Sequence, residues 1–265
     1  ANFVFRNFPK FMIRSAANND YLFSLNDFVK NLRTSFVLIL NDDMKLAPDV
    51  LNKIMPVISA DSQLFSVGCN VLNWEGTETT VGLRVMQYSR GWMRTYFDEL
   101  EDEKLRYTLY GGGGAAVFNT EYFNQLGGFN TLMRPAYGED LDLGHRAWHK
   151  GWKSVIHPTA YLFHRDGATI KQQFTSSALE QKISKNLILW MLRNVDVPGF
   201  LFFFFLLLPS RIIKWKKSQP NMYIAFKEAL PKFADALRQR KNTGKAKMTD
   251  KQIMKLLNKE YELKK

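Results

Sequence analysis

The apolar residues of the chain change their spacing once, from runs typical of strands to a periodicity typical of helices. Residues 36–40 are apolar at every position, which is typical of a strand in a sheet that helices cover on both faces. Residues 64–73 form a second, largely apolar run, and a helical pattern that begins near Val50 separates the two. This alternation predicts an α/β fold with a mostly parallel sheet and helices on both faces.

The middle of the chain is rich in residues that favour turns. Residues 74–106 are polar and aromatic with weak periodicity, and we interpret them as a variable surface region with a hairpin and a short helix. Four glycines at 111–114 precede an apolar stretch, so the backbone can approach a ligand closely or turn sharply there. The elements expected beyond them are helices at 120–126 and 140–149 and strands at 153–156 and 160–163.

From Ser176 onward the pattern is helical and the chain changes character. No charged residue lies between Asp196 and Arg211, and residues 200–208 consist of Phe and Leu only. This segment is shorter than the roughly 20 apolar residues that span a bilayer. Residues 249–252, Thr-Asp-Lys-Gln, have the form of a capping box ahead of a last helix.

The positive charge of the chain is concentrated in this last part. The net charge is +12, and residues 211–265 contain 16 Lys/Arg against 5 Asp/Glu, so the remainder is nearly neutral. A cationic segment beside an apolar block favours a position in the membrane interface. We therefore divide the chain into residues 1–175 and a helical, basic, membrane-associating tail at residues 176–265.

Two other interpretations of the tail stay open. Its helices could pack on the body of the protein, with residues 200–208 forming a core helix. It could also be a nucleic-acid-binding arm, but four consecutive Phe residues argue against that partner.

The rest of the composition places few limits on function. The single cysteine, Cys69, excludes a disulfide framework and fits a reducing compartment. The chain begins at Ala1 without a basic segment followed by an apolar one, so no signal peptide is visible.

The first group of candidate ligand-binding residues follows the strand at 36–40. Asn41, Asp42 and Asp43 would lie beyond the carboxyl end of that strand, where open α/β sheets bind ligands. A divalent cation, Mg²⁺ or Mn²⁺, prefers carboxylate and phosphate oxygens and can join such a carboxylate to a diphosphate. The other interpretation of this motif alone is a solvated turn that caps the next helix.

A second acidic group opens the helix expected at 140–149. Backbone N–H groups and the helix dipole stabilise carboxylates in a first turn, which accounts for at least one of Glu139, Asp140 and Asp142. Three carboxylates behind Gly138 exceed what capping requires. We expect Asp140 to take a proton from an acceptor hydroxyl, and Glu139 and Asp142 to position it or to contact the acceptor.

The four histidines are not equivalent. His145, His149 and His157 fit structural or surface positions. His164 ends an expected strand, and its imidazole is a candidate third metal ligand. The next residue, Arg165, is a candidate partner for a diphosphate.

Four motifs in this order carry a family resemblance. They are Asn-Asp-Asp after a strand, Gly-Gly-Phe-Asn at 127–130, Gly-Glu-Asp-Leu-Asp-Leu-Gly-His-Arg at 138–146, and Tyr-Leu-Phe-His-Arg at 161–165. Over about residues 15–170 the chain resembles inverting family 2 glycosyltransferases of the GT-A fold. The basic tail resembles the membrane-associating extension of bacterial members that build cell-surface polysaccharide on lipid carriers.

The resemblance implies a function and a set of roles. It implies metal-dependent transfer of a sugar, with inversion, from a nucleotide-sugar donor to a lipid-linked or polysaccharide acceptor at the cytoplasmic face of the membrane. Asp140 would be the base, assisted by Glu139 and Asp142. The metal ligands would be Asp43 and His164. The residues expected at the donor are Asn41, Asp42, Gly113, Gly114 and Arg165.

One departure from the family pattern leaves an alternative. Members usually open with strands that hold the nucleoside base, and nothing before Ala16 matches them, so about 50 expected residues are missing. Asn41 also stands where many members have Asp. A sheet without its first strands exposes an edge and favours a second copy or a partner chain. The alternative is therefore a non-catalytic or split GT-A module that binds a membrane or a partner.

Overall fold

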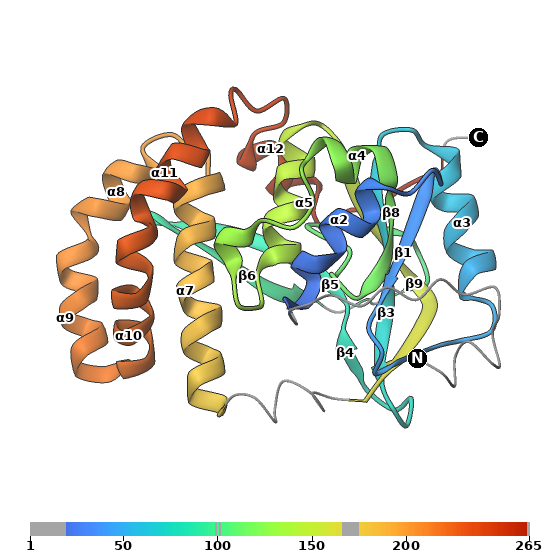
Figure 1. Cartoon of the computed structure of the whole chain (residues 1–265), viewed down its shortest axis with the longest axis horizontal. Coiled ribbons are helices and arrows are strands. Elements are labelled where there is room, and N and C mark those ends of the chain that lie inside the picture. Colours follow the sequence, from blue (N-terminus) through green and yellow to red (C-terminus); the bar gives the residue numbers. More distant parts are fainter. Residues whose placement is uncertain (1–19, 99, 101, 166–174, 264–265) are drawn as a thin grey trace.

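The computed structural model describes residues 20–98, 100, 102–165 and 175–263, and a mixed seven-stranded sheet lies at the centre of this fold (Figure 1). The main strand order is β1-β8-β3-β9-β2, with β4 paired to β3 and β7 paired to β9. The strands are β1 (Phe36–Leu40), β2 (Met44–Leu46), β3 (Leu64–Asn73), β4 (Thr79–Val81), β7 (Arg106–Thr108), β8 (Ala115–Asn119) and β9 (Lys153–His164).

The sheet combines parallel and antiparallel pairs. Strands β3 and β9 pair in parallel, and β1 runs in the same direction, as the predicted mostly parallel arrangement requires. Strand β8 lies between β1 and β3 and is antiparallel to both, and the short strands β2, β4 and β7 are antiparallel to their partners. The predicted α/β class is confirmed, and the sheet is mixed because β8 and the short strands β2, β4 and β7 run opposite to β1, β3 and β9.

Helices cover both faces of the sheet, as the apolar runs predicted. Helix α3 (Val50–Ala60) packs on one face, and α2 (Leu25–Lys30), α4 (Thr120–Gln125) and α5 (Glu139–His149) lie over the other (Figure 1). Side chains of β8 alternate between the two cores, because successive strand residues point to opposite faces. Val117 contacts the α3 side, whereas Phe118 belongs to the larger core that includes Phe123 of α4.

Two details in the strands differ from the sequence-based expectation. Residues 74–106 contain the expected hairpin, β5 (Leu83–Ser89) paired with β6 (Trp92–Asp98), but their described residues contain no helix. The two short strands expected at 153–156 and 160–163 are one strand, β9. A register shift opposite Cys69 and Asn70 accommodates the region of Pro158, which has no N–H group to donate to the ladder.

The last part of the chain is helical and packs against the body. Its helices are α7 (Ser176–Asn194), α8 (Phe200–Leu206), α9 (Leu208–Ser218), α10 (Pro220–Ala229), α11 (Phe233–Asn242) and α12 (Asp250–Leu256). A 3₁₀ helix, η3 (Leu230–Lys232), lies between α10 and α11, and two more of the described 3₁₀ helices lie earlier in the chain, η1 (Tyr21–Ser24) and η2 (Thr131–Met133). The expected capping box at Thr249 and Gln252 is present at the start of α12.

The tail and the body share one hydrophobic core. Buried residues of α7 and α8, including Trp190 and Phe204, belong to the same cluster as Phe118 and Trp148. Beyond α12 the chain returns to the sheet, where the Tyr261 hydroxyl donates to Asp61 at 3.1 Å. The division at residue 175 stays a prediction, and these contacts cross it.

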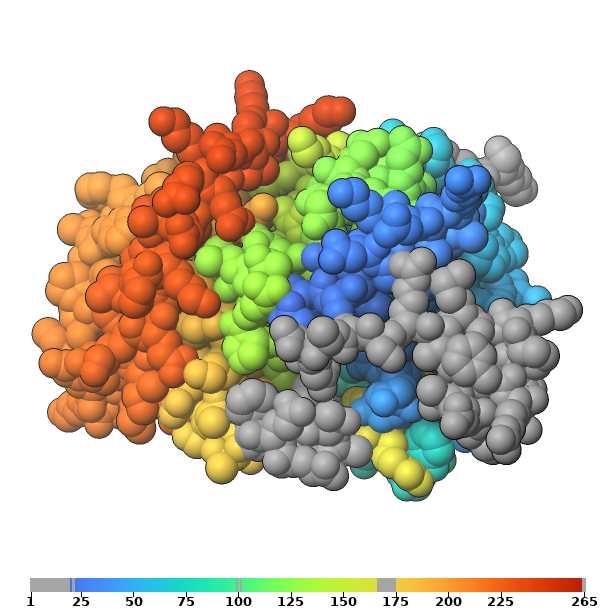
Figure 2. Space-filling model, viewed as in Figure 1, coloured from blue at the N-terminus to red at the C-terminus, as the bar shows by residue number. Residues whose placement is uncertain are grey.

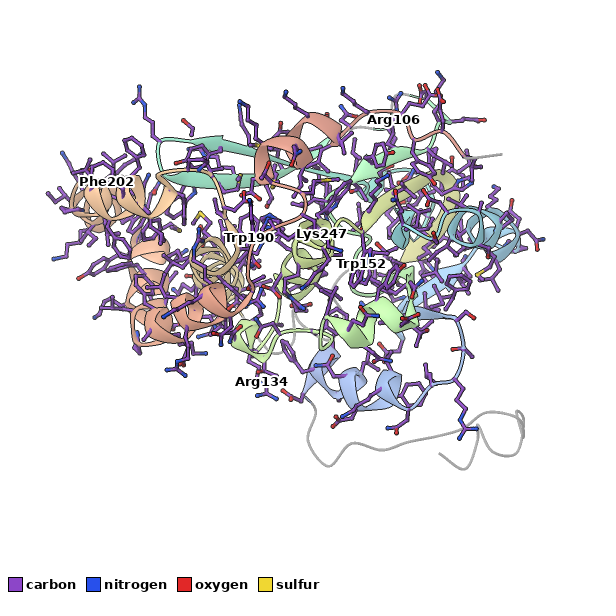
Figure 3. All side chains as sticks on the ribbon, turned by 90° about the horizontal axis from the view of Figure 1, so that it is seen from above. Arg106, Arg134, Trp152, Trp190, Phe202 and Lys247 are labelled. Atoms are coloured by element: carbon purple, nitrogen blue, oxygen red, sulfur yellow. The ribbon has the colours of Figure 1, made fainter. Side chains whose placement is uncertain are left out.

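The apolar block at residues 200–208 is divided between core and surface. Phe200 and Phe204 are buried, whereas Phe202 is 64% exposed and points outward at the far end of the helical part (Figure 3). None of the described helices combines the length and the apolar character needed to cross a bilayer.

Candidate active site

Three segments that are distant in the sequence meet where β1 ends. The end of β1 meets the start of β8, where Leu40 pairs with Ala115 and the Asn41 N–H donates to the Gly114 carbonyl at 3.3 Å. The Gly113 N–H in turn donates to Asp140 Oδ2 at 3.2 Å. The two acidic motifs are therefore joined through the glycine run.

Protein atoms approach two of these glycines closely. A Cβ atom on Gly114 would lie 2.3 Å from the Asn41 side-chain oxygen, and one on Gly113 would lie 3.4 Å from Asp140 Cβ. In the structure Gly114 thus lies against Asn41, and Gly113 lies against Asp140. Their expected contact with a donor stays a prediction.

Asp43 and His164, the two metal ligands that the sequence predicts, lie side by side. The end of β9 lies beside the start of β2, where Met44 pairs with His164. This pairing places His164 Nε2 3.3 Å from Asp43 Oδ2, and each side chain is 19% exposed. Asp43 Oδ1 is buried and has no hydrogen-bond partner among the described residues. An imidazole beside a carboxylate with one uncommitted oxygen fits a divalent cation such as Mn²⁺ or Mg²⁺.

Two cationic side chains lie close to the Trp74 ring, and one of them was not foreseen. Asp42 and Arg165 are exposed, and the Arg165 guanidinium lies 5.1 Å from the Trp74 ring centroid. Lys45 Nζ lies 4.9 Å from the same ring. Lys45 could have been found from the sequence, because it follows Asp43 by only two residues.

The second acidic group begins α5 behind a left-handed glycine. Gly138 has a φ of 87°, a conformation that favours glycine, and the helix starts directly after it. Asp140 is half-buried and its Oδ1 accepts the Leu141 N–H at 2.7 Å. Glu139 is only 2% exposed, and its Oε2 has no hydrogen-bond partner among the described residues.

Burial changes the acidity of both carboxyl groups. Burial, reinforced by the neighbouring charge of Asp140, raises the pKa of Glu139 to about 8. Burial also raises the pKa of Asp140, against the N–H groups of Leu141 and Gly113, which stabilise its anion. A carboxylate with a raised pKa is a stronger base, which is the property that proton abstraction requires.

Arg84 and Tyr110 lie near Asp140 and were not identified from the sequence. The positive charge of Arg84 opposes the rise in the Asp140 pKa. Burial first, and then the Asp140 charge, raise the pKa of Tyr110. Arg84 Nε and Nη1 are buried without a hydrogen-bond partner among the described residues. Arg84 lies in a region whose weak periodicity gave no signal for a functional residue.

The structure corrects one part of the predicted role of Asp142. Its side chain is fully buried, with Oδ2 2.7 Å from Arg146 Nε and Oδ1 3.1 Å from Arg193 Nη1. The Asn194 amide also donates to Oδ1 at 2.8 Å. Because both oxygens are committed in the core, Asp142 cannot contact an acceptor. It holds α5 against α7 instead.

The chain belongs to the glycosyltransferase-like family 2, whose model matches residues 6–191. The predicted family is thus confirmed, and the fold is that of GT-A glycosyltransferases. The bacterial polysaccharide type stays a prediction. The departure expected before Ala16 lies outside the described residues.

Solved structures of glycosyltransferases have a similar fold. One is GalNAc-T7 with UDP, GalNAc and Mn²⁺, at 13% identity and a TM-score of 0.58, covering 92% of this chain and 44% of that one. Another is the mannosyltransferase PcManGT from Pyrobaculum calidifontis with GDP-Man and Mn²⁺, at 12% identity and a TM-score of 0.45, covering 88% of this chain and 67% of that one. The chain therefore spans less than half the length of GalNAc-T7, and this likeness concerns the fold alone. No curated protein sequence matches the chain.

Proposed function

We propose that the chain is a metal-dependent glycosyltransferase that moves a sugar from a nucleotide-sugar donor to an acceptor hydroxyl with inversion. The observation that carries this proposal is the connection of the Asp43–His164 pair to Asp140 through Asn41 and the glycine run. The family supplies the reaction class.

The residues around Asp43 would hold the donor. Asp43 and His164 would hold a divalent cation, which neutralises charge on the donor's diphosphate when bound. Arg165 and Lys45 carry positive charge toward the same region, which suits a diphosphate. The exposed carboxylate of Asp42 would contact the donor's ribose or diphosphate.

Asp140 would perform the proton transfer. The acceptor oxygen forms a bond to the anomeric carbon while the bond from that carbon to the diphosphate breaks on the opposite face. The hydroxyl proton passes to Asp140, and the electron pair of the broken bond leaves with the diphosphate. The Gly113 N–H holds one Asp140 oxygen, and Glu139 lies beside it as a buried acid.

Replacing the base tests this assignment. Asp140→Asn should lower turnover by about 10²–10⁴-fold, the usual contribution of a general base. Nucleotide binding should persist, because the Asp43 side of the site is unchanged. The assay measures nucleoside diphosphate released from a panel of nucleotide sugars, with a bacterial lipid extract as the acceptor source. Asp49→Asn, at an exposed carboxylate ahead of α3, is the matched control.

The result that contradicts this role is equal turnover of wild type and Asp140→Asn. If neither protein releases nucleoside diphosphate nor binds any nucleotide, the alternative of a non-catalytic or split GT-A module is favoured.

We further propose that the protein associates with the cytoplasmic face of a membrane and uses a lipid-linked or polysaccharide acceptor. Large apolar side chains are exposed along α8 and α9, among them Phe202, Leu206 and Ile213, at 64%, 57% and 68%. Exposed lysines, Lys214, Lys216 and Lys217, lie on the same helix as Ile213. Residues of the helical part form one continuous end of the molecule (Figure 2, orange to red). Apolar residues beside cations suit the interface of an anionic bilayer.

A further inference from the structure

Two histidines of α5 meet one aspartate from the far end of the chain. His145 and His149 are four residues apart, so they lie on the same face of the helix. Asp250 is the first residue of α12, and its Oδ1 lies 2.7 Å from His145 Nε2 and 2.9 Å from His149 Nε2. The three side chains are 0%, 5% and 0% exposed, and their potential ligand atoms lie within 4.8 Å of one another.

A second carboxylate adjoins this cluster. Asp250 Oδ2 accepts the Asp196 N–H at 2.9 Å, and Asp196 Oδ1 accepts the Asp250 N–H at 2.8 Å. Two carboxylates are thus adjacent in a largely buried region, and Arg240 is the guanidinium whose charge acts on both. A buried carboxylate is costly unless a positive charge compensates it, so a further cation would stabilise the group.

Other parts of the chain enclose the two imidazoles. Trp190 packs against His145 at a ring-centroid distance of 5.4 Å, and the Lys247 N–H donates to the His149 carbonyl at 2.8 Å. Both of these neighbours are labelled in Figure 3.

We propose that His145, His149 and Asp250 bind one zinc ion that links α5 to α12. Two imidazole nitrogens and one carboxylate oxygen form a donor set that zinc accepts, and the His-x-x-x-His spacing on a helix directs both rings to one point. The adjoining carboxylate of Asp196 offers a further oxygen donor. Because the three ligands are buried, this ion is structural and separate from the proposed donor-site cation at Asp43.

The proposed zinc site lies on the same helix as the proposed catalytic base. Helix α5 begins with Glu139 and Asp140, and His145 lies on the next turns of the same helix. The segment after α12 returns to the sheet at Tyr261. A zinc ion would therefore fix the C-terminal segment to the helix that carries the proposed base.

Zinc binding by the whole chain tests the proposal. The protein is freed of metal with a chelator, titrated with Zn²⁺ against a colorimetric indicator, and analysed for zinc after gel filtration. We expect one zinc per wild-type chain and a rise of several degrees in Tm, because a ligand that binds only the folded state stabilises it. The His145→Gln/His149→Gln variant should lose both effects. Asp43→Asn and His157→Gln, the latter at a half-buried histidine outside the cluster, should retain both.

Three results would overturn the proposal. The first is a wild-type chain that binds no zinc and whose Tm does not change, which would leave a hydrogen-bonded trio without an ion. This result does not depend on the folding of any variant. The second is zinc retained in full by the double histidine variant. The third is zinc lost in Asp43→Asn, which would assign the ion to the donor site.

Discussion

At the scale of single residues, the neighbouring carboxyl groups of Glu139 and Asp140 at the start of α5 are largely shielded from solvent. Glu139 is buried without a hydrogen-bond partner for Oε2 among the described residues, and Asp140 is held by two N–H groups. The environment therefore favours a neutral Glu139 beside an Asp140 that can exchange a proton. Two carboxyl groups that titrate as a pair divide the acid and base roles in this way in many active sites.

Burial of Glu139 makes stability depend on pH. Its pKa of about 8 lies above the 4.5 of an exposed glutamate, so the folded state binds this proton more tightly than the unfolded chain. The stability from the neutral acid is complete below about pH 4.5 and is lost as the pH rises through 8. Glu139→Gln cannot ionise. Its free energy of unfolding should therefore fall less steeply than that of wild type between pH 5 and 8, by up to about 1.4 kcal/mol per pH unit.

Urea unfolding at several pH values measures this difference. Glu121→Gln, at an exposed carboxyl of α4, is the matched control and should follow the wild-type slope. Parallel pH dependences for wild type and Glu139→Gln would contradict the burial of Glu139 as a neutral acid.

Sequence reasoning at this scale found the residues that lie in short motifs. Asp43 follows β1, His164 ends β9, and Asp140 lies in the first turn of α5. Their places at the ends of these elements could therefore be predicted from the order of elements along the chain. Arg84 and Tyr110 carry no such signal, because they approach Asp140 only through the tertiary packing of a hairpin and a loop. The full burial of Asp142 could not be predicted either, because it depends on Arg193, 51 residues away.

At the scale of elements, α5 is positioned by α7, the long helix that follows the proposed catalytic residues in the chain. Arg193 and Asn194 near the end of α7 bind Asp142, and Asn186 earlier in α7 donates to the carbonyl of Tyr137, just before the Gly138 turn. The start of α5 is thus held from the tail side. A division of the chain that assigns α7 to a separate tail misses this support.

Breaking this contact should destabilise the protein strongly. Asp142→Ala leaves Arg146 and Arg193 without their buried partner, and removing one member of a buried ion pair usually costs about 3–5 kcal/mol. Asp235→Ala removes an exposed partner of Arg238 in α11 and should change stability by less than about 0.5 kcal/mol. Chemical unfolding of both variants provides the measurement. A change of under about 1 kcal/mol in Asp142→Ala would show that the network does not hold α5 in place.

At the scale of the whole molecule, charge and apolar surface are concentrated in the helical part. The sequence located this asymmetry from composition alone. It could not show that Phe200 and Phe204 would be buried while Phe202 faces outward, because a charge-free run gives no periodicity by which to separate the two faces. The structure therefore supports parts of two interpretations that the sequence left open: the block contributes to the core and also presents an apolar surface.

The exposed part of this surface should control membrane binding. Phe202→Ser/Ile213→Ser removes the two most exposed large apolar side chains of α8 and α9. We expect wild type to float with vesicles that contain anionic lipid, and the variant to float at least about tenfold less, because apolar burial drives interfacial binding. Leu51→Ser removes an apolar side chain of α3 that is 48% exposed and should float like wild type. Equal flotation of all three proteins would assign membrane binding to another surface or exclude it.

The most direct test of the proposed function is the binding of nucleoside diphosphates with and without a divalent cation. Isothermal titration calorimetry of wild type and Asp43→Asn, with UDP, GDP, ADP and dTDP in the presence of Mn²⁺ or of chelator, provides it. We predict that wild type binds at least one of these nucleotides, that chelator weakens this binding at least about tenfold, and that Asp43→Asn binds weakly in both conditions. Binding that is equally strong without metal and without the Asp43 carboxylate would contradict the proposed site.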